Sequence, residues 1–118
     1  LEVRDHLVVH HGRDAVELTR PIERCEPPNQ GFHHASPVRV AWVYLHESAS
    51  LDEAVSRMAD TLRRFSISVG KAEKYSEPTT VFWMLQVAAA RAVMPGATLD
   101  AVLRAYPRLL DKDLIRPL

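Results

Sequence analysis

Residues 50–70, SLDEAVSRMADTLRRFSISVG, carry the clearest helical pattern in this chain. Ser50 with Glu53 three residues later forms a capping box, which marks the start of a helix. Gly70 is typical of the position at which a helix stops. The apolar residues between these two signals repeat at helical spacing, with the charged residues mostly outside their stripe: Leu51, Val55, Met58, Leu62, Phe65 and Val69. We therefore expect an amphipathic helix here, with this stripe against a core.

A second helix is predicted to begin at Ser36, a good N-cap, followed by Pro37 at the first helical position. Proline suits that position because its missing N–H has no helical partner there. The residues that follow have an apolar surface over most of the helix circumference: Val38, Val40, Ala41, Trp42, Val43, Tyr44 and Leu45. A helix that is apolar nearly all round is buried on several sides, so we expect it to be central.

Two further helices follow the amphipathic one. Pro78 and two threonines open a third helix that ends near Met94, before Pro95 and Gly96, and its alanine tract 88–90 favours close packing. Thr98 caps a shorter fourth helix that Pro107 ends. The apolar face of this fourth helix consists of Leu99, Val102, Leu103 and Tyr106. Residues 108–118 are predicted to form one more turn and a tail.

The N-terminal residues leave two alternatives open. HLVVHH, a turn at Gly12, and AVELT at 15–19 are consistent with a short β-hairpin, while a helix over Ala15 to Glu26 is a close rival that Pro21 weakens. PPNQG at 27–31 is a loop on either interpretation. We therefore predict an all-α fold in a single domain, 1–118. Residues 1–31 form an arm and loop, and 32–118 form a compact bundle of about four helices.

Composition narrows the function classes. A chain of 118 residues that is 47% hydrophobic and 25% charged is typical of one soluble domain. Fifteen basic residues balance fifteen acidic ones, which argues against nucleic acid or an anionic membrane as partner. The most apolar run, Val81 to Met94, is interrupted by Gln86 and Arg91 and is shorter than a membrane-spanning helix. The single Cys25 fits a reducing compartment, so we expect a cytoplasmic protein.

Six histidines could supply metal ligands or proton-transfer groups: His6, His10, His11, His33, His34 and His46. Their spacing forms no recognised site, and the favoured interpretation is that most are surface side chains. The chain contains no GxSxG, no glycine-rich phosphate loop and no HExxH. The hydroxyls after Tyr75 are best explained as helix caps. The aromatic residues Trp42, Phe82 and Trp83 are most simply core residues.

Residues 32–45, FHHASPVRVAWVYL, and 70–83, GKAEKYSEPTTVFW, together resemble a family of small uncharacterised bacterial helical proteins. Its pattern is Phe-x-His-x-x-His-Leu-Arg-Val-Ala-Trp, an amphipathic helix, and then Tyr-His-Glu-Thr-x-Thr. The resemblance covers roughly residues 32–110. It implies three histidines that gather at one place, which is the number a zinc or iron site commonly uses.

This chain departs from that pattern at two of the three histidines. His34 matches, but Pro37 and Ser76 stand where the other two belong. One imidazole with a nearby carboxylate rarely holds a transition metal, so we expect no bound metal and no cofactor. The resemblance thus implies a degenerate, formerly metal-binding scaffold.

We expect a non-catalytic helical protein, either an accessory protein or one that binds a small anionic or carbonyl-bearing ligand. The residues predicted to converge on one cavity are His34, Arg39, Tyr75, Glu77 and Thr80, with Trp42 or Trp83 as an apolar wall. An equally weighted alternative is that Arg39 and Glu77 form a buried structural ion pair. A rival hypothesis is an enzyme in which His34 is the acid or base, oriented by Glu77. A third is a homodimer whose apolar helix faces pair.

Overall fold

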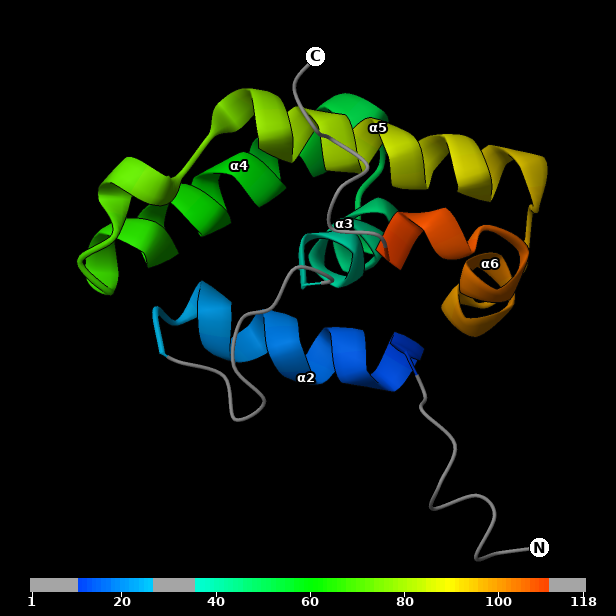
Figure 1. Ribbon diagram of the computed structural model, residues 1–118, viewed down its shortest axis with the longest axis horizontal. Coiled ribbons are helices and arrows are strands. Elements are labelled where there is room, and N and C mark those ends of the chain that lie inside the picture. Colours follow the sequence, from blue (N-terminus) through cyan, green and yellow to red (C-terminus); the bar gives the residue numbers. More distant parts are fainter. Residues whose placement is uncertain (1–10, 27–35, 111–118) are drawn as a thin grey trace, which may run out of the picture.

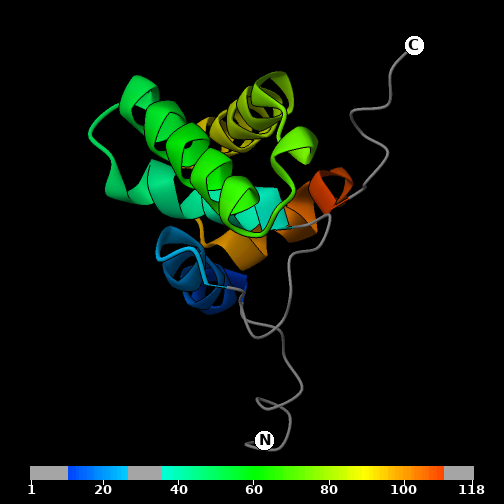
Figure 2. The ribbon, with the colours of Figure 1, turned by 90° about the vertical axis from the view of Figure 1, so that its left-hand side faces the viewer.

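The computed structural model describes residues 11–26 and 36–110, and in this part of the chain the fold is all-α, as predicted. It contains the helices α2 (His11–Glu23), α3 (Ser36–Glu47), α4 (Leu51–Ser68), α5 (Glu77–Val93) and α6 (Leu99–Ala105), and the 3₁₀ turns η1 (Ala72–Lys74) and η2 (Pro107–Leu110). Helix α3 lies in the middle, between α2 on one side and the α4–α5 pair on the other (Figures 1 and 2). Helix α6 lies near one end of α2 and of α3 (Figure 1).

The helix starts follow the capping residues of the sequence. The side-chain oxygens of Ser50, Ser76 and Thr98 each accept a hydrogen bond from the backbone N–H three residues later, at 3.1, 3.3 and 3.1 Å. The cap at Ser76 moves the start of α5 one residue ahead of the predicted Pro78. Ser36 differs from the expectation, because it lies within the first turn of α3 and is buried.

Two helix ends have the same hydrogen-bond pattern on different residues. After α4, Gly70 has φ 74°. Its N–H donates to the Ile67 carbonyl, and the N–H of Lys71 donates to the Ser66 carbonyl. This is a Schellman motif, in which glycine is favoured because the left-handed region costs it nothing. After α2, Cys25 occupies the equivalent position with φ 57°, and the N–H groups of Cys25 and Glu26 bond in the same way.

Replacing Cys25 by glycine should therefore raise the free energy of unfolding by up to about 1 kcal/mol. The left-handed conformation costs an L-residue roughly 1–2 kcal/mol, part of which is offset by the larger entropy of glycine in the unfolded chain. Urea denaturation of Cys25→Gly measures the difference. The matched control is Gly70→Ala, where no atom lies within 4 Å of an added Cβ. The free energy of unfolding of that variant should fall by a similar amount. If Cys25→Gly also lowered the free energy of unfolding, the prediction would be wrong.

The core consists of side chains from every α-helix. Helix α3 packs against α2, α4 and α5, so the predicted central helix is confirmed. Its buried apolar residues are Val38, Val40, Ala41, Val43 and Tyr44. The predicted stripe of α4 is only partly confirmed. Its middle is buried, but Leu51 and Val69 at the two ends are 41% and 37% exposed. The periodic pattern extends beyond the length of α4 that neighbouring helices cover.

The segment predicted to be an arm contains a core helix. Residues 15–19, the second strand of the hairpin alternative, lie within α2, while its first strand falls outside the described residues. Ala15, Leu18 and Ile22 are at most 1% exposed and belong to the hydrophobic core. Helix α2 continues past Pro21 to Glu23, although a proline has no N–H to donate to the carbonyl four residues earlier. The helix alternative is therefore correct for residues 15–23, and α2 packs as part of the bundle.

Candidate functional site

A cleft opens between α2, α3, the end of α5 and the turn into α6. Its volume is about 480 Å³, within the range of small-molecule sites. Most of its wall is apolar, and Val16 is 42% exposed there. The residues that line it are Val16, Trp42, Val43, His46, Glu47, Arg91, Met94, Gly96, Ala97, Thr98 and Leu99.

Arg91 is the central polar group of this cleft. Its guanidinium carbon lies 4.9 Å from the centre of the Trp42 ring, which is a cation–π contact between α5 and α3. Within residues 11–26 and 36–110, Arg91 forms no ion pair with a carboxylate. The ring holds the guanidinium in place without neutralising it, so the cation remains available to an anion.

Among the described residues, the cleft wall has one carboxylate, and it is already engaged. Glu47 contacts Arg20 of α2, and its other oxygen lies 3.7 Å from a guanidinium nitrogen of Arg57 of α4. Two cations therefore share this charge. Arg91, the imidazole of His46 and the hydroxyl of Thr98 are described side chains of the cleft that can donate a hydrogen bond to an anion.

Behind the cleft, a polar network joins α2, α3 and α4 around Tyr44. The buried hydroxyl of Tyr44 donates to Glu23 at 2.6 Å and lies 2.8 Å from the Thr61 hydroxyl. Arg20 also bonds Glu23, at 2.9 Å, and Arg57 lies over the Tyr44 ring at 4.7 Å.

This network shifts the pKa of its members. Burial, together with the bond to Glu23, raises the pKa of Tyr44, so the phenol stays protonated. Burial acts to raise the pKa of Glu23, but the hydrogen bonds from Tyr44 and Arg20 outweigh it and lower that pKa below 4.5. The network is organised to keep Glu23 ionised and Tyr44 neutral, which suits a structural role.

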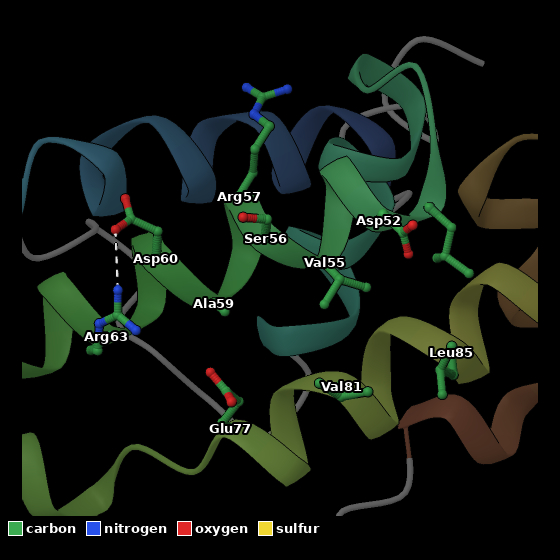
Figure 3. Close-up of a pocket in the computed structure, with 11 residues that line it drawn as sticks. Asp52, Val55, Ser56, Arg57, Ala59, Asp60, Arg63, Glu77, Val81 and Leu85 are labelled. Atoms are coloured by element: carbon green, nitrogen blue, oxygen red, sulfur yellow. Dashed lines mark hydrogen bonds and ion pairs between the residues drawn. The ribbon is translucent and has the colours of Figure 1, made fainter.

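The predicted site residues are distributed over different parts of the molecule. Trp42 lines the cleft, whereas the exposed Glu77 lies in a groove between α4 and α5 (Figure 3). Arg91, which contacts Trp42, follows Glu77 by fourteen residues, about 21 Å along a helix. Trp42 and Glu77 therefore do not share a cavity. Trp83 is only 4% exposed and packs edge-on against Phe82, with 5.4 Å between the ring centres. It is therefore a core residue and does not form the apolar wall of a ligand site.

The other predicted residues have local roles or none assigned. Thr80 is buried, and its hydroxyl donates to the Ser76 carbonyl at 3.0 Å. Tyr75 is half-buried, and its hydroxyl has no hydrogen-bond partner within the described chain. Arg39 is half-buried on α3 and forms no ion pair with Glu77, so the predicted structural pair is wrong. None of these three residues lines the cleft or the groove.

His34 lies outside the described residues, and so do Phe32 and His33 of the same motif. The convergence of the other residues on His34 therefore stays a prediction. Across the two described ranges, no group of three histidine, cysteine or acidic side chains could hold a metal ion. In the same ranges, no helix has the length and apolar character needed to cross a membrane.

The residues that complete the cleft were not predicted from the sequence. His46 was counted among the histidines without a role, and Arg91 only as an interruption of an apolar run. Arg91 is the one charged residue between positions 78 and 93. An isolated cation in an otherwise apolar helix was the signal available for this site.

Comparison of the chain with protein-family models, curated proteins and solved structures found no match.

Proposed function

We propose that this protein is a non-catalytic helical protein that binds a small anionic or carbonyl-bearing ligand in the Trp42 cleft. The observation that carries the proposal is the Arg91 guanidinium, which lies over the Trp42 ring without a carboxylate partner among the described residues. A charged group that is partly buried is costly unless it is paired, and an anionic ligand would supply the missing partner.

The apolar wall of the cleft narrows the ligand class. Val16, Met94 and Ala97 offer no charge, and Glu47 is engaged by two arginines. A ligand with one carboxylate or carbonyl and an apolar chain would place its oxygen at Arg91 or His46. Its chain would cover the exposed face of Val16. Amphipathic monocarboxylates have this chemistry.

The scaffold and its cellular setting are part of the same proposal. The motif residues Arg39, Trp42, Tyr75 and Glu77 support derivation from the bacterial family that the sequence resembles, with the metal site lost at Pro37 and Ser76. A single free cysteine supports a cytoplasmic location. The rival hypothesis, an enzyme with His34 and Glu77 as its acid–base pair, stays a prediction, because His34 lies outside the described residues.

Octanoate should bind the cleft and change the fluorescence of Trp42, whereas octylamine should not. The variant Trp83→Phe leaves Trp42 as the single tryptophan, because the chain has two. In that background Arg91→Gln should weaken octanoate binding by about 10-fold or more, since a charge-assisted hydrogen bond contributes roughly 1.5–3 kcal/mol.

Arg104→Gln is the matched control, because Arg104 is exposed on α6 and does not line the cleft. Its affinity for octanoate should equal that of the parent. Equal binding of octanoate and octylamine, or equal affinity in the Arg91 and Arg104 variants, would contradict the proposal.

A further inference from the structure

The groove between α4 and α5 is a second surface that the proposed function does not use. It has a volume of about 740 Å³ and lies between two antiparallel stretches of helix (Figure 3). Its floor is apolar and comes from both helices: Val55 and Ala59 of α4, and Val81 of α5. Leu51 and Leu85, which also line it, are 41% and 46% exposed. Large apolar side chains lined up in a groove mark an interaction surface more often than isolated ones do.

Most charges beside this groove are already neutralised. Asp60 is bonded by Arg63 at 3.4 Å and by Arg64 at 2.9 Å. Arg57 is directed away from α5, toward the Tyr44 ring and Glu47 (Figure 3). These groups offer little net charge to a partner.

Two carboxylates of the groove stand apart from these ion pairs. Asp52 and Glu77 form no ion pair with any residue of the described ranges. They lie at opposite ends of the groove and on opposite walls, Asp52 on α4 and Glu77 on α5 (Figure 3). Acidic residues are common in the first turn of any helix, so their position alone identifies nothing. Because they lie at the two ends of an apolar floor, a complementary partner would combine an apolar surface with a basic residue near each end.

We propose that this groove binds an amphipathic helix of a protein partner, whose apolar stripe lies between α4 and α5 and whose flanks carry lysine or arginine. The exposed leucines would receive the stripe, and the two carboxylates would pair with one basic residue on each flank. The groove spans Leu51 to Arg63 of α4, about 18 Å, which matches roughly three turns of helix. Unpaired carboxylates repel phosphate, so they disfavour an anionic membrane or nucleic acid at this surface.

A synthetic peptide tests the proposal. The probe is a fluorescent helix of about 14 residues with leucine at i, i+3, i+4 and i+7 and lysine on both flanks. Its anisotropy should rise on titration with the protein. A peptide with glutamate in place of each lysine should bind at least ~10-fold more weakly, because attraction at both ends becomes repulsion. Binding of the lysine peptide should weaken as salt is raised from about 0.05 to about 0.5 M.

Variants locate the binding surface. Leu85→Asp should weaken binding of the lysine peptide at least ~10-fold, by removing an apolar contact and placing a charge on the floor. Val93→Asp is its control, because Val93 is 67% exposed on the same helix and lies outside this groove. Asp52→Asn with Glu77→Gln should weaken binding ~2- to 10-fold and reduce its salt dependence. Glu17→Gln with Glu73→Gln is the control for that pair, since both residues are exposed elsewhere.

The proposal fails if the two peptides bind equally, or if the control variants weaken binding as much as the groove variants. It also fails if sedimentation shows a dimer that Leu85→Asp dissociates, because the occupant would then be a second copy of this chain. Octanoate binding at Trp42 should be unchanged in every groove variant, so the two proposals are tested separately.

Discussion

Replacing Leu18 by alanine is expected to lower the free energy of unfolding by about 2–5 kcal/mol, the usual cost of truncating a buried leucine. Leu18 is 1% exposed on α2, within the cluster that α3 and α4 complete. The loss would be a large part of the roughly 5–15 kcal/mol that stabilises a small domain. Urea or thermal denaturation followed by circular dichroism measures it.

The control is Val16→Ala on the same helix, because Val16 is 42% exposed. It should cost less than about 1 kcal/mol, since little apolar surface is lost. If the two variants lose the same small amount, α2 contributes nothing to the core. The prediction of an N-terminal arm would then be correct for residues 15–23.

Replacing Tyr44 by phenylalanine should lower the free energy of unfolding by about 1.5–3 kcal/mol at neutral pH, because the partly buried, ionised Glu23 loses a hydrogen-bond donor. The variant should also change how stability depends on pH. The folded-state pKa of Glu23 is below the ordinary value of 4.5. Its contribution is therefore present above about pH 4.5 and is lost as the pH falls through the lowered pKa.

Denaturation curves from pH 7 to pH 2.5 should accordingly converge for the parent and Tyr44→Phe at the acid end. Thr61→Val is the matched control, because it removes the other hydroxyl that contacts Tyr44 and leaves the bond to Glu23 intact. It should be less stable than the parent by a similar amount at every pH. A constant difference between Tyr44→Phe and the parent would show that Glu23 does not depend on this bond.

The helix boundaries were largely predictable because capping is local. Ser50 and Thr98 were identified as caps from their own sequence neighbourhoods, and each bonds an N–H three residues away. Gly70 was identified as a stop for the same reason. Cys25 was missed, because nothing in the sequence marks a cysteine as the residue that adopts the left-handed conformation.

The conformation of the N-terminal residues was less predictable. Residues 15–19 have both strand-like and helix-like composition, so local preference left the choice open. In the structure, helical spacing brings Ala15, Leu18 and Ile22 onto one buried face. Burial of that face against the rest of the bundle accounts for the helix in spite of Pro21, and this contact is not encoded within the segment itself.

The candidate site was the least predictable part. Trp42 and Trp83 both stand in apolar helices, yet one lines a cleft and the other is buried in the core. Arg39 was the predicted anion-binding residue because it belongs to the motif of residues 32–45 and stands near the start of a predicted helix. The cation that the structure places on the Trp42 ring is Arg91, from another helix.

The sequence by itself determined the all-α class and most helix starts and stops, because these depend on hydrogen bonds within three to five residues and on the helical repeat of apolar side chains. Only the tertiary structure decided that α2 joins the core, that Arg91 lies on Trp42, and that Glu77 lies in a groove away from Trp42. Those features depend on how the helices pack against one another, which brings together residues far apart in the chain, such as Trp42 and Arg91, 49 positions apart.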